Sequence, residues 1–139
     1  TRSLARRRRE ARRTRRLPSM APDLPAGMVT FLVTDVEGAT RLLDRFPEAG
    51  FRTLDWYQQL TQSIVRSHQG ITFSAAGDTL SSAFSNPVNA VQAAIDLQRR
   101  YVEQPIAEGG PLKVRVAIHS GAAEPHNGQY PAPTLYVTR

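Results

Sequence analysis

Two aspartates, each beside a glycine and an apolar stretch, are the residues of this chain best suited to chemistry. Asp35 follows the apolar run 28–34 and precedes Gly38, and Asp78 follows Gly77 between two further apolar stretches. Carboxylate oxygens, usually together with phosphate oxygens, are the ligands that Mg²⁺ prefers. Taken singly, Asp35 reads as a strand-end or capping carboxylate and Asp78 as a turn residue. Taken together, they predict a site that could hold a divalent metal ion over a phosphate.

The elements that would position these aspartates follow from the spacing of apolar residues. We expect a strand over 28–34, a short helical turn over 40–46 capped by Thr40, a helix over 47–68, a hairpin of strands 71–75 and 79–84, a helix from 87 and a strand over 112–119. The buried stripes of the two long helices are predicted to be Phe51, Leu54, Tyr57, Leu60, Ile64 and Val65 in the first and Val88, Val91, Ala94, Ile95 and Tyr101 in the second.

This order, β-α-β-β-α-β, is typical of the ferredoxin-like α+β fold, in which two helices cover one face of an antiparallel sheet. The first and third strands of that fold are neighbours, so Asp35 and the hairpin tip at Asp78 can converge. After the last strand the segment 120–128 is expected to turn the chain, and 129–139 could begin another strand.

Composition limits the classes of protein that this chain can represent. The 139 residues suit one small domain, with no cysteine for a disulfide or thiolate zinc site and no apolar run near the ~20 residues that span a bilayer. The first residues show no secretory signal. We therefore expect a soluble, cytoplasmic protein.

The net charge of +6 belongs to the N-terminal segment. Residues 1–16 carry nine Arg and one Glu, so the remainder carries a net charge of −2 and offers no basic patch for nucleic acid. Three interpretations of 1–19 stay open: sequence upstream of a start at Met20, which we favour, a linker from another domain, or an arm that binds nucleic-acid phosphates. We expect 1–27 to be an Arg-rich, disordered tail and lead-in, and 28–139 to be the domain.

The motifs resemble those of class III nucleotide cyclases, the adenylate and guanylate cyclase catalytic domains, in their bacterial branch. The family pattern runs close to Phe-Leu-Phe-Thr-Asp-Ile-Glu-Gly-Ser-Thr, then Gly-Asp-Gly, then Arg-x-Gly-x-His-x-Gly. This chain has FLVTDVEGAT at 31–40, GDT at 77–79 and RVAIHSG at 115–121. The match covers about 27–134 with order and spacing intact.

The resemblance implies a two-metal site and a nucleotide. Asp35 and Asp78 match the ligands of two Mg²⁺ or Mn²⁺ ions, and Val36 matches a position whose backbone carbonyl helps. The amides of four successive residues at a helix start match the phosphate cradle: Glu37, Gly38, Ala39 and Thr40. The implied parent reaction converts ATP, or GTP, to the 3′,5′-cyclic nucleotide and pyrophosphate, in intracellular signal transduction.

The nucleotide-base and transition-state positions depart from the family. Ser74 stands where the family has a Lys that reads the purine, and Gln129 stands at a second base-reading position. The catalytic Asn aligns with Tyr136 by ungapped counting, which places the expected Arg beyond the end of the chain. If Arg139 serves instead, Leu135 falls at the Asn position. No transition-state residue is therefore intact, and we expect a domain incomplete at its C-terminus that is inactive alone.

In the family the site forms between two protomers, one supplying the metals and the other the base contacts. The resemblance therefore implies a homodimer, or a heterodimer with a complete cyclase domain. The alternative is a non-catalytic module that binds nucleotide or dimerises and was formerly attached to a transcriptional regulator. His68, His119 and His126 show no zinc-ligand spacing, and His119 is expected to be a packed strand residue.

Overall fold

The computed structural model describes residues 23–103 and 112–131 as seven helices and strands. In chain order they are β1 (Gly27–Val36), α2 (Ala39–Arg45), α3 (Pro47–Ser67), β2 (Ile71–Ala76), β3 (Thr79–Phe84), α4 (Pro87–Glu103) and β4 (Val114–Ala123). The Arg-rich segment, Met20, Tyr136 and Arg139 lie outside the described residues. None of the helices in these two ranges has the length and apolarity needed to cross a bilayer.

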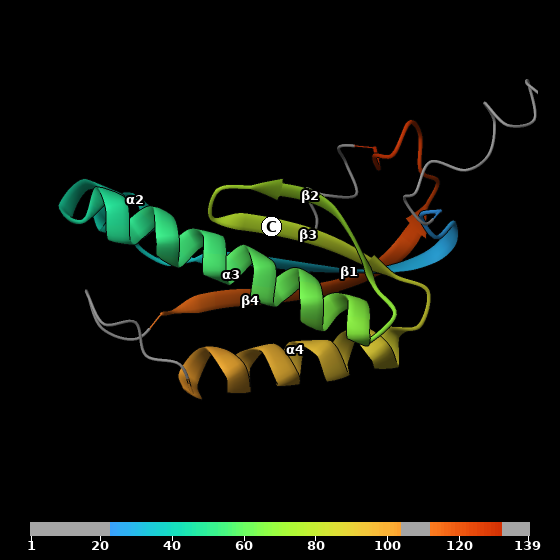
Figure 1. Ribbon diagram of the computed structural model, residues 1–139. Coiled ribbons are helices and arrows are strands. Elements are labelled where there is room, and N and C mark those ends of the chain that lie inside the picture. Colours follow the sequence, from blue (N-terminus) through green and yellow to red (C-terminus); the bar gives the residue numbers. More distant parts are fainter. Residues whose placement is uncertain (1–22, 104–111, 132–139) are drawn as a thin grey trace, which may run out of the picture.

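The four strands form one antiparallel sheet in the order β2-β3-β1-β4. Figure 1 shows α3 and α4 lying side by side on one face of this sheet. The predicted α+β arrangement is confirmed, including the pairing of the first strand with the third. Because β1 lies between β3 and β4, its end at Val36 is flanked by the start of β3 and the start of β4.

The main core lies between the sheet and the two long helices. From β1 it takes Leu32 and Val36, which alternate with residues of the opposite face as a strand requires. A smaller cluster covers the opposite face, where Phe31 makes edge-to-face contacts with Phe73 and Tyr130, at centroid distances of 6.1 and 4.8 Å. Both faces of β1 are therefore buried over much of its length, as its nearly continuous apolar sequence predicts.

The stripe predicted for α4 is wrong at three positions. Val88, Val91 and Ile95 are 46–58% exposed, although Tyr101 is buried and Ala94 half-buried as expected. The residues buried against the sheet and α3 are Ala90, Ala93, Leu97 and Tyr101. Small alanine side chains let the helix approach the sheet closely, so the wider apolar face that the sequence shows is not all covered.

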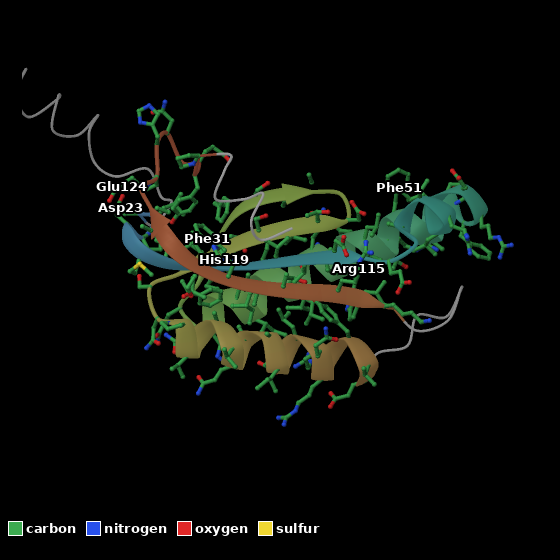
Figure 2. The ribbon with its side chains drawn as sticks, turned by 180° about the vertical axis from the view of Figure 1, so that it is seen from behind. Asp23, Phe31, Phe51, Arg115, His119 and Glu124 are labelled. Carbon is green, nitrogen blue, oxygen red and sulfur yellow. The ribbon has the colours of Figure 1, made fainter. Side chains whose placement is uncertain are left out.

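The stripe predicted for α3 holds from Leu54 onward but fails at Phe51, which is 66% exposed. Figure 2 shows Phe51 beside α2, near the end of the molecule where α3 begins. The preceding short helix also begins differently from the prediction. It starts at Ala39, and its N-cap is Gly38 in the left-handed conformation, with φ of 74°, rather than Thr40.

β4 continues past the turn that was predicted at Ser120. Its partner β1 is ten residues long and supplies backbone groups as far as Gly27, so pairing extends to Ala123. The hydroxyls of Thr30 and Ser120 are hydrogen-bonded at 2.8 Å on these paired strands. The chain instead turns between His126 and Gln129, which form an isolated bridge.

The end of α3 gives a test of local geometry. Gln69 adopts the left-handed conformation, with φ of 65°, whereas a Cβ placed on Gly70 would lie 2.5 Å from the Phe84 ring and 2.8 Å from the Val65 side chain. Gly70→Ala should therefore lower the free energy of unfolding by about 1–3 kcal/mol through overpacking. Gln69→Gly, the matched control, should be neutral or stabilising by about 0.5 kcal/mol. Chemical denaturation measures the free energy of unfolding of both variants. Equal effects of the two substitutions would contradict the conclusion that close packing requires glycine at residue 70.

Candidate metal and nucleotide site

The two aspartates meet at one end of the sheet. Asp35 is the next-to-last residue of β1 and pairs with Thr79, the first residue of β3, so Asp78 lies immediately beside it in the turn. The backbone amide of Val36 donates to the carbonyl oxygen of Asp78 at 3.0 Å. The carboxylates thus come from neighbouring strand ends, as the strand order predicted.

The hairpin turn that carries Asp78 is also attached to a helix. The Nε2 atom of Gln58, on α3, donates to the carbonyl oxygen of Gly77 at 2.7 Å. Beneath the site the hydroxyls of Thr34 and Tyr57 are hydrogen-bonded at 2.5 Å, and both side chains are fully buried. Burial raises the pKa of Tyr57 because the phenolate would lose its hydration, so this support stays neutral. Two residues of α3, Tyr57 and Gln58, therefore hold the strand and the turn next to the aspartates in place.

The side chain of Arg115 is hydrogen-bonded to the carboxylate of Asp35. Its Nε donates to Oδ1 at 2.7 Å and its Nη2 to Oδ2 at 2.8 Å, the bidentate geometry of an arginine–carboxylate pair. The two residues are direct partners across β1 and β4. Figure 2 shows Arg115 at the same end of the sheet as Phe51, near the start of α3. Phe31 and His119 lie farther along the same strands, β1 and β4.

The electrostatics of this corner are dominated by negative charge. The hydrogen bonds that Arg115 donates to Asp35, followed by the charge of Asp35 and then those of Glu37 and Asp78, raise the pKa of the Arg115 guanidinium. The side chain of Arg115 is 69% exposed and that of Asp35 is 31% exposed, so water screens their attraction. A fully charged guanidinium therefore faces three carboxylates across a partly solvated corner.

The loop from β1 into α2 follows directly from the site. The amide of Glu37 donates to the carbonyl oxygen of Lys113 at 2.8 Å, so this amide is committed to the backbone of the chain. Gly38, with its left-handed φ, turns the chain into α2, and the amides of Ala39 and Thr40 lie in its first turn. The first amides of an α-helix have no intrahelical acceptor and can bind anions.

The two base-reading positions lie on separate elements. Ser74 is on the edge strand β2, opposite Ser81 and beside a register shift, and one strand, β3, separates β2 from β1, which carries Asp35. Gln129 is exposed in the turn that follows β4, at the opposite end of β1. Eight residues of strand, roughly 25 Å, separate that end from Asp35. The structure brings Asp35, Val36 and Asp78 together but not Gln129.

No group of three or more His, Asp or Glu side chains suited to a metal ion occurs within 23–103 and 112–131. The three histidines lie on separate elements: His68 contacts Asp96 of α4 at 3.2 Å, His119 is in β4, and His126 is in the final turn. The candidate donors are therefore the two aspartates and the backbone at Val36.

Sequence reasoning missed the pairing of Arg115 with Asp35. Arg115 appears in the sequence only as a polar residue within an alternating strand and as part of a motif. Its partner depends on the register of β4 against β1. Asp35 and Arg115 are 80 positions apart in the chain, so local sequence does not show that they pair. The only signal in the sequence was a charged residue, Arg115, within a predicted strand of mostly apolar residues.

The chain is similar to known proteins in sequence and in fold. No protein-family model matches the chain. It is 28% identical over 116 residues to an uncharacterized protein of Mycobacterium tuberculosis, a match that covers 82% of this chain and 38% of that relative. The chain thus spans less than two fifths of the length of this relative.

Several solved structures have a fold similar to that of this chain. Adenylate cyclases from Trypanosoma brucei in their monomeric state match with a TM-score of 0.73 at 22% identity, covering 85% of this chain and 69% of theirs. The guanylate cyclase domain of Catenaria anguillulae in complex with GTP matches with a TM-score of 0.64 at 19% identity, covering 70% and 58%. The described part of this chain therefore has the fold of the class III adenylate and guanylate cyclase catalytic domain.

Proposed function

We propose that this domain binds a divalent metal–nucleoside triphosphate complex at the end of the sheet where β1 meets β3. The observation that carries the proposal is the register of these strands, which places Asp35 beside the turn residue Asp78, with Val36 bonded to the backbone of Asp78 at 3.0 Å. Nucleotide cyclases and this domain share their fold, and the motif residues Asp35, Val36 and Asp78 lie at this corner.

The donor set suits Mg²⁺ or Mn²⁺. Two carboxylates and a backbone carbonyl, here of Asp35, Asp78 and Val36, are hard oxygen donors, and Mg²⁺ is commonly bound by one or two carboxylates together with substrate phosphates. When bound, a pair of such ions supplies charge stabilisation for attacking and leaving oxygens in phosphoryl chemistry. The residues of this chain would hold and orient the ions from neighbouring strand ends.

The phosphates would lie against the loop that enters α2. The amides of Gly38, Ala39 and Thr40 are the proposed contacts, and the Glu37 amide is left out because it donates to Lys113. The base would be contacted from a second protomer, because Gln129 lies at the far end of β1 from Asp35. The functional unit we propose is thus a homodimer, or a heterodimer with a complete cyclase domain.

Cyclisation of ATP or GTP is the parent reaction that we infer for this fold. We propose that the chain alone does not perform it, because Ser74 is too short to replace a base-reading Lys and the position of the catalytic Asn holds Tyr136 or Leu135. A non-catalytic nucleotide-binding or dimerising regulatory module is the second candidate, and Ser74 is the observation that favours it.

Titration of the full chain with Mn²⁺ and either ATP or GTP, followed calorimetrically, tests the proposal. We expect metal-dependent nucleotide binding. Chromatography of the same mixtures, after addition of a complete cyclase domain that lacks its own metal-ligand aspartates, separates the two candidates. Cyclic nucleotide formed only with the added domain supports the cyclase half-site, and its absence supports the regulatory module. If neither nucleotide binds in the presence of Mn²⁺, the proposed function and the nucleotide-binding form of the second candidate are both wrong. Binding of equal strength in the presence of EDTA would contradict the metal site.

A further inference from the structure

We propose that Arg115 is a displaceable counter-ion of Asp35: its guanidinium holds the carboxylate in the absence of metal and must leave it before a divalent cation binds there. The inference rests on the proposed function, because Asp35 is the metal ligand named above. It assigns to Arg115 a role in setting metal affinity, although the residue contacts neither Asp78 nor Val36 through a hydrogen bond.

The geometry shows why the two ligands compete. Both oxygens of Asp35 are engaged at once, at 2.7 and 2.8 Å, by the fork of the Arg115 side chain. The residues are paired directly across β1 and β4, so the backbone keeps the guanidinium within reach of the carboxylate whenever the sheet is formed. A metal ion approaching from Asp78 thus meets a carboxylate that is already occupied.

Sharing the carboxylate is disfavoured by charge. Each oxygen retains a second lone pair, but a guanidinium and a divalent cation on one carboxylate repel each other at short range. Moving the guanidinium away is easy by comparison. Its side chain is 69% exposed, and an exposed ion pair contributes little to stability because water and salt screen it. We therefore infer displacement rather than a shared complex.

The surrounding charges explain what the pair does when no metal is bound. Glu37 and Asp78 also act on Arg115, so its guanidinium offsets mutual repulsion among three carboxylates. A bound divalent cation would offset the same repulsion and make the guanidinium dispensable. Removing Arg115 should consequently favour the metal-bound state over the metal-free state.

The test compares Mn²⁺ binding by Arg115→Ala and by the unsubstituted parent chain, using loss of the free Mn²⁺ paramagnetic resonance signal. We expect Arg115→Ala to bind Mn²⁺ about threefold to tenfold more tightly at low ionic strength, and the difference to shrink as salt rises. Arg115→Gln, which keeps a polar side chain of similar width, should change affinity in the same direction and covers the case of poor folding by the alanine variant. Lys113→Ala removes one nearby positive charge that has no bond to Asp35 and should change affinity less than twofold.

A second readout is the thermal midpoint with and without Mn²⁺. The rise caused by Mn²⁺ should be larger for Arg115→Ala than for the parent chain, because tighter binding to the folded state stabilises it more. Weaker or equal Mn²⁺ binding by both Arg115 variants, with the parent binding normally, would overturn the counter-ion role and leave the metal site standing. Absence of Mn²⁺ binding in parent and variants alike would overturn the metal site as well. Binding by the variants alone would support both.

Discussion

Asp78→Asn should lower the affinity for Mn²⁺–ATP about a hundredfold or more and leave the fold unchanged. Loss of a hydrogen-bonding partner behind a metal ligand already costs 10–100-fold in affinity in typical sites, and loss of a direct carboxylate ligand should reach at least the upper end of that range. Asp35→Asn should have an effect of similar size. Isothermal calorimetry gives the affinity, and the far-ultraviolet circular dichroism of each variant shows whether the helices persist.

The matched control for these variants is Asp44→Asn. Asp44 is an exposed carboxylate on α2, so its replacement changes the net charge by the same amount without touching the strand ends. Its affinity for Mn²⁺–ATP should stay within about twofold of the parent, because exposed charges are screened over about a Debye length. Retention of parental affinity by both Asp35→Asn and Asp78→Asn would show that the proposed site is wrong.

The second large effect expected is alkaline unfolding driven by buried tyrosines. Tyr57 and Tyr101 are fully buried and bonded to Thr34 and Thr61, and burial raises the pKa of both phenols above the ordinary value of 10. The folded state keeps these phenols protonated while the unfolded state releases the protons above pH 10. Stability is therefore present below that pH and lost as the pH rises toward the folded-state pKa values.

The size of this loss follows from linkage. Each tyrosine that is neutral only in the folded state lowers the free energy of unfolding by about 1.4 kcal/mol per pH unit above pH ~10. Two such residues lower it by roughly 5 kcal/mol at pH 12, which approaches the whole stability of many small domains. Denaturant unfolding at several pH values between 9 and 12 measures the slope.

Double replacement of Tyr57 and Tyr101 by Phe is the diagnostic variant. It keeps the rings but removes the titrating hydroxyls, so it should start about 2 kcal/mol less stable through two lost hydrogen bonds and then decline less with pH. Tyr130→Phe is the comparison. Burial raises the pKa of Tyr130 to about 12, so its replacement removes one smaller contribution and leaves most of the slope. Identical slopes in the parent and the double variant would contradict the role of the buried phenols.

Much of the fold is readable from local sequence because local rules decide it. The predicted helix over 47–68 is observed as Pro47–Ser67, and the hairpin strands are observed as Ile71–Ala76 and Thr79–Phe84. A proline begins each long helix and a glycine-containing turn joins the hairpin, and these signals act over a few residues. The order of elements then restricts the sheet to few topologies.

Burial was harder to predict because it depends on what lies opposite. Val88 and Ile95 have the spacing of core residues, yet α4 rests on Ala90 and Ala93, whose small side chains allow close contact with the sheet. The length of β4 was underestimated for a similar reason, since its end is set by the ten-residue partner β1 and not by the glycine at 121.

The sequence by itself determined that two aspartates follow strand-forming runs, that a short helical turn and a long helix lie between them in the chain, and that their motifs resemble those of nucleotide cyclases. Strand order then allowed Asp35 and Asp78 to be placed at one end of a sheet. Only the tertiary structure decided that Arg115 holds Asp35, that the Glu37 amide is committed to Lys113, and that Gln129 lies at the far end of β1. These facts arise from the register of strands distant in sequence, and register is fixed by packing of the whole sheet, not by any local segment.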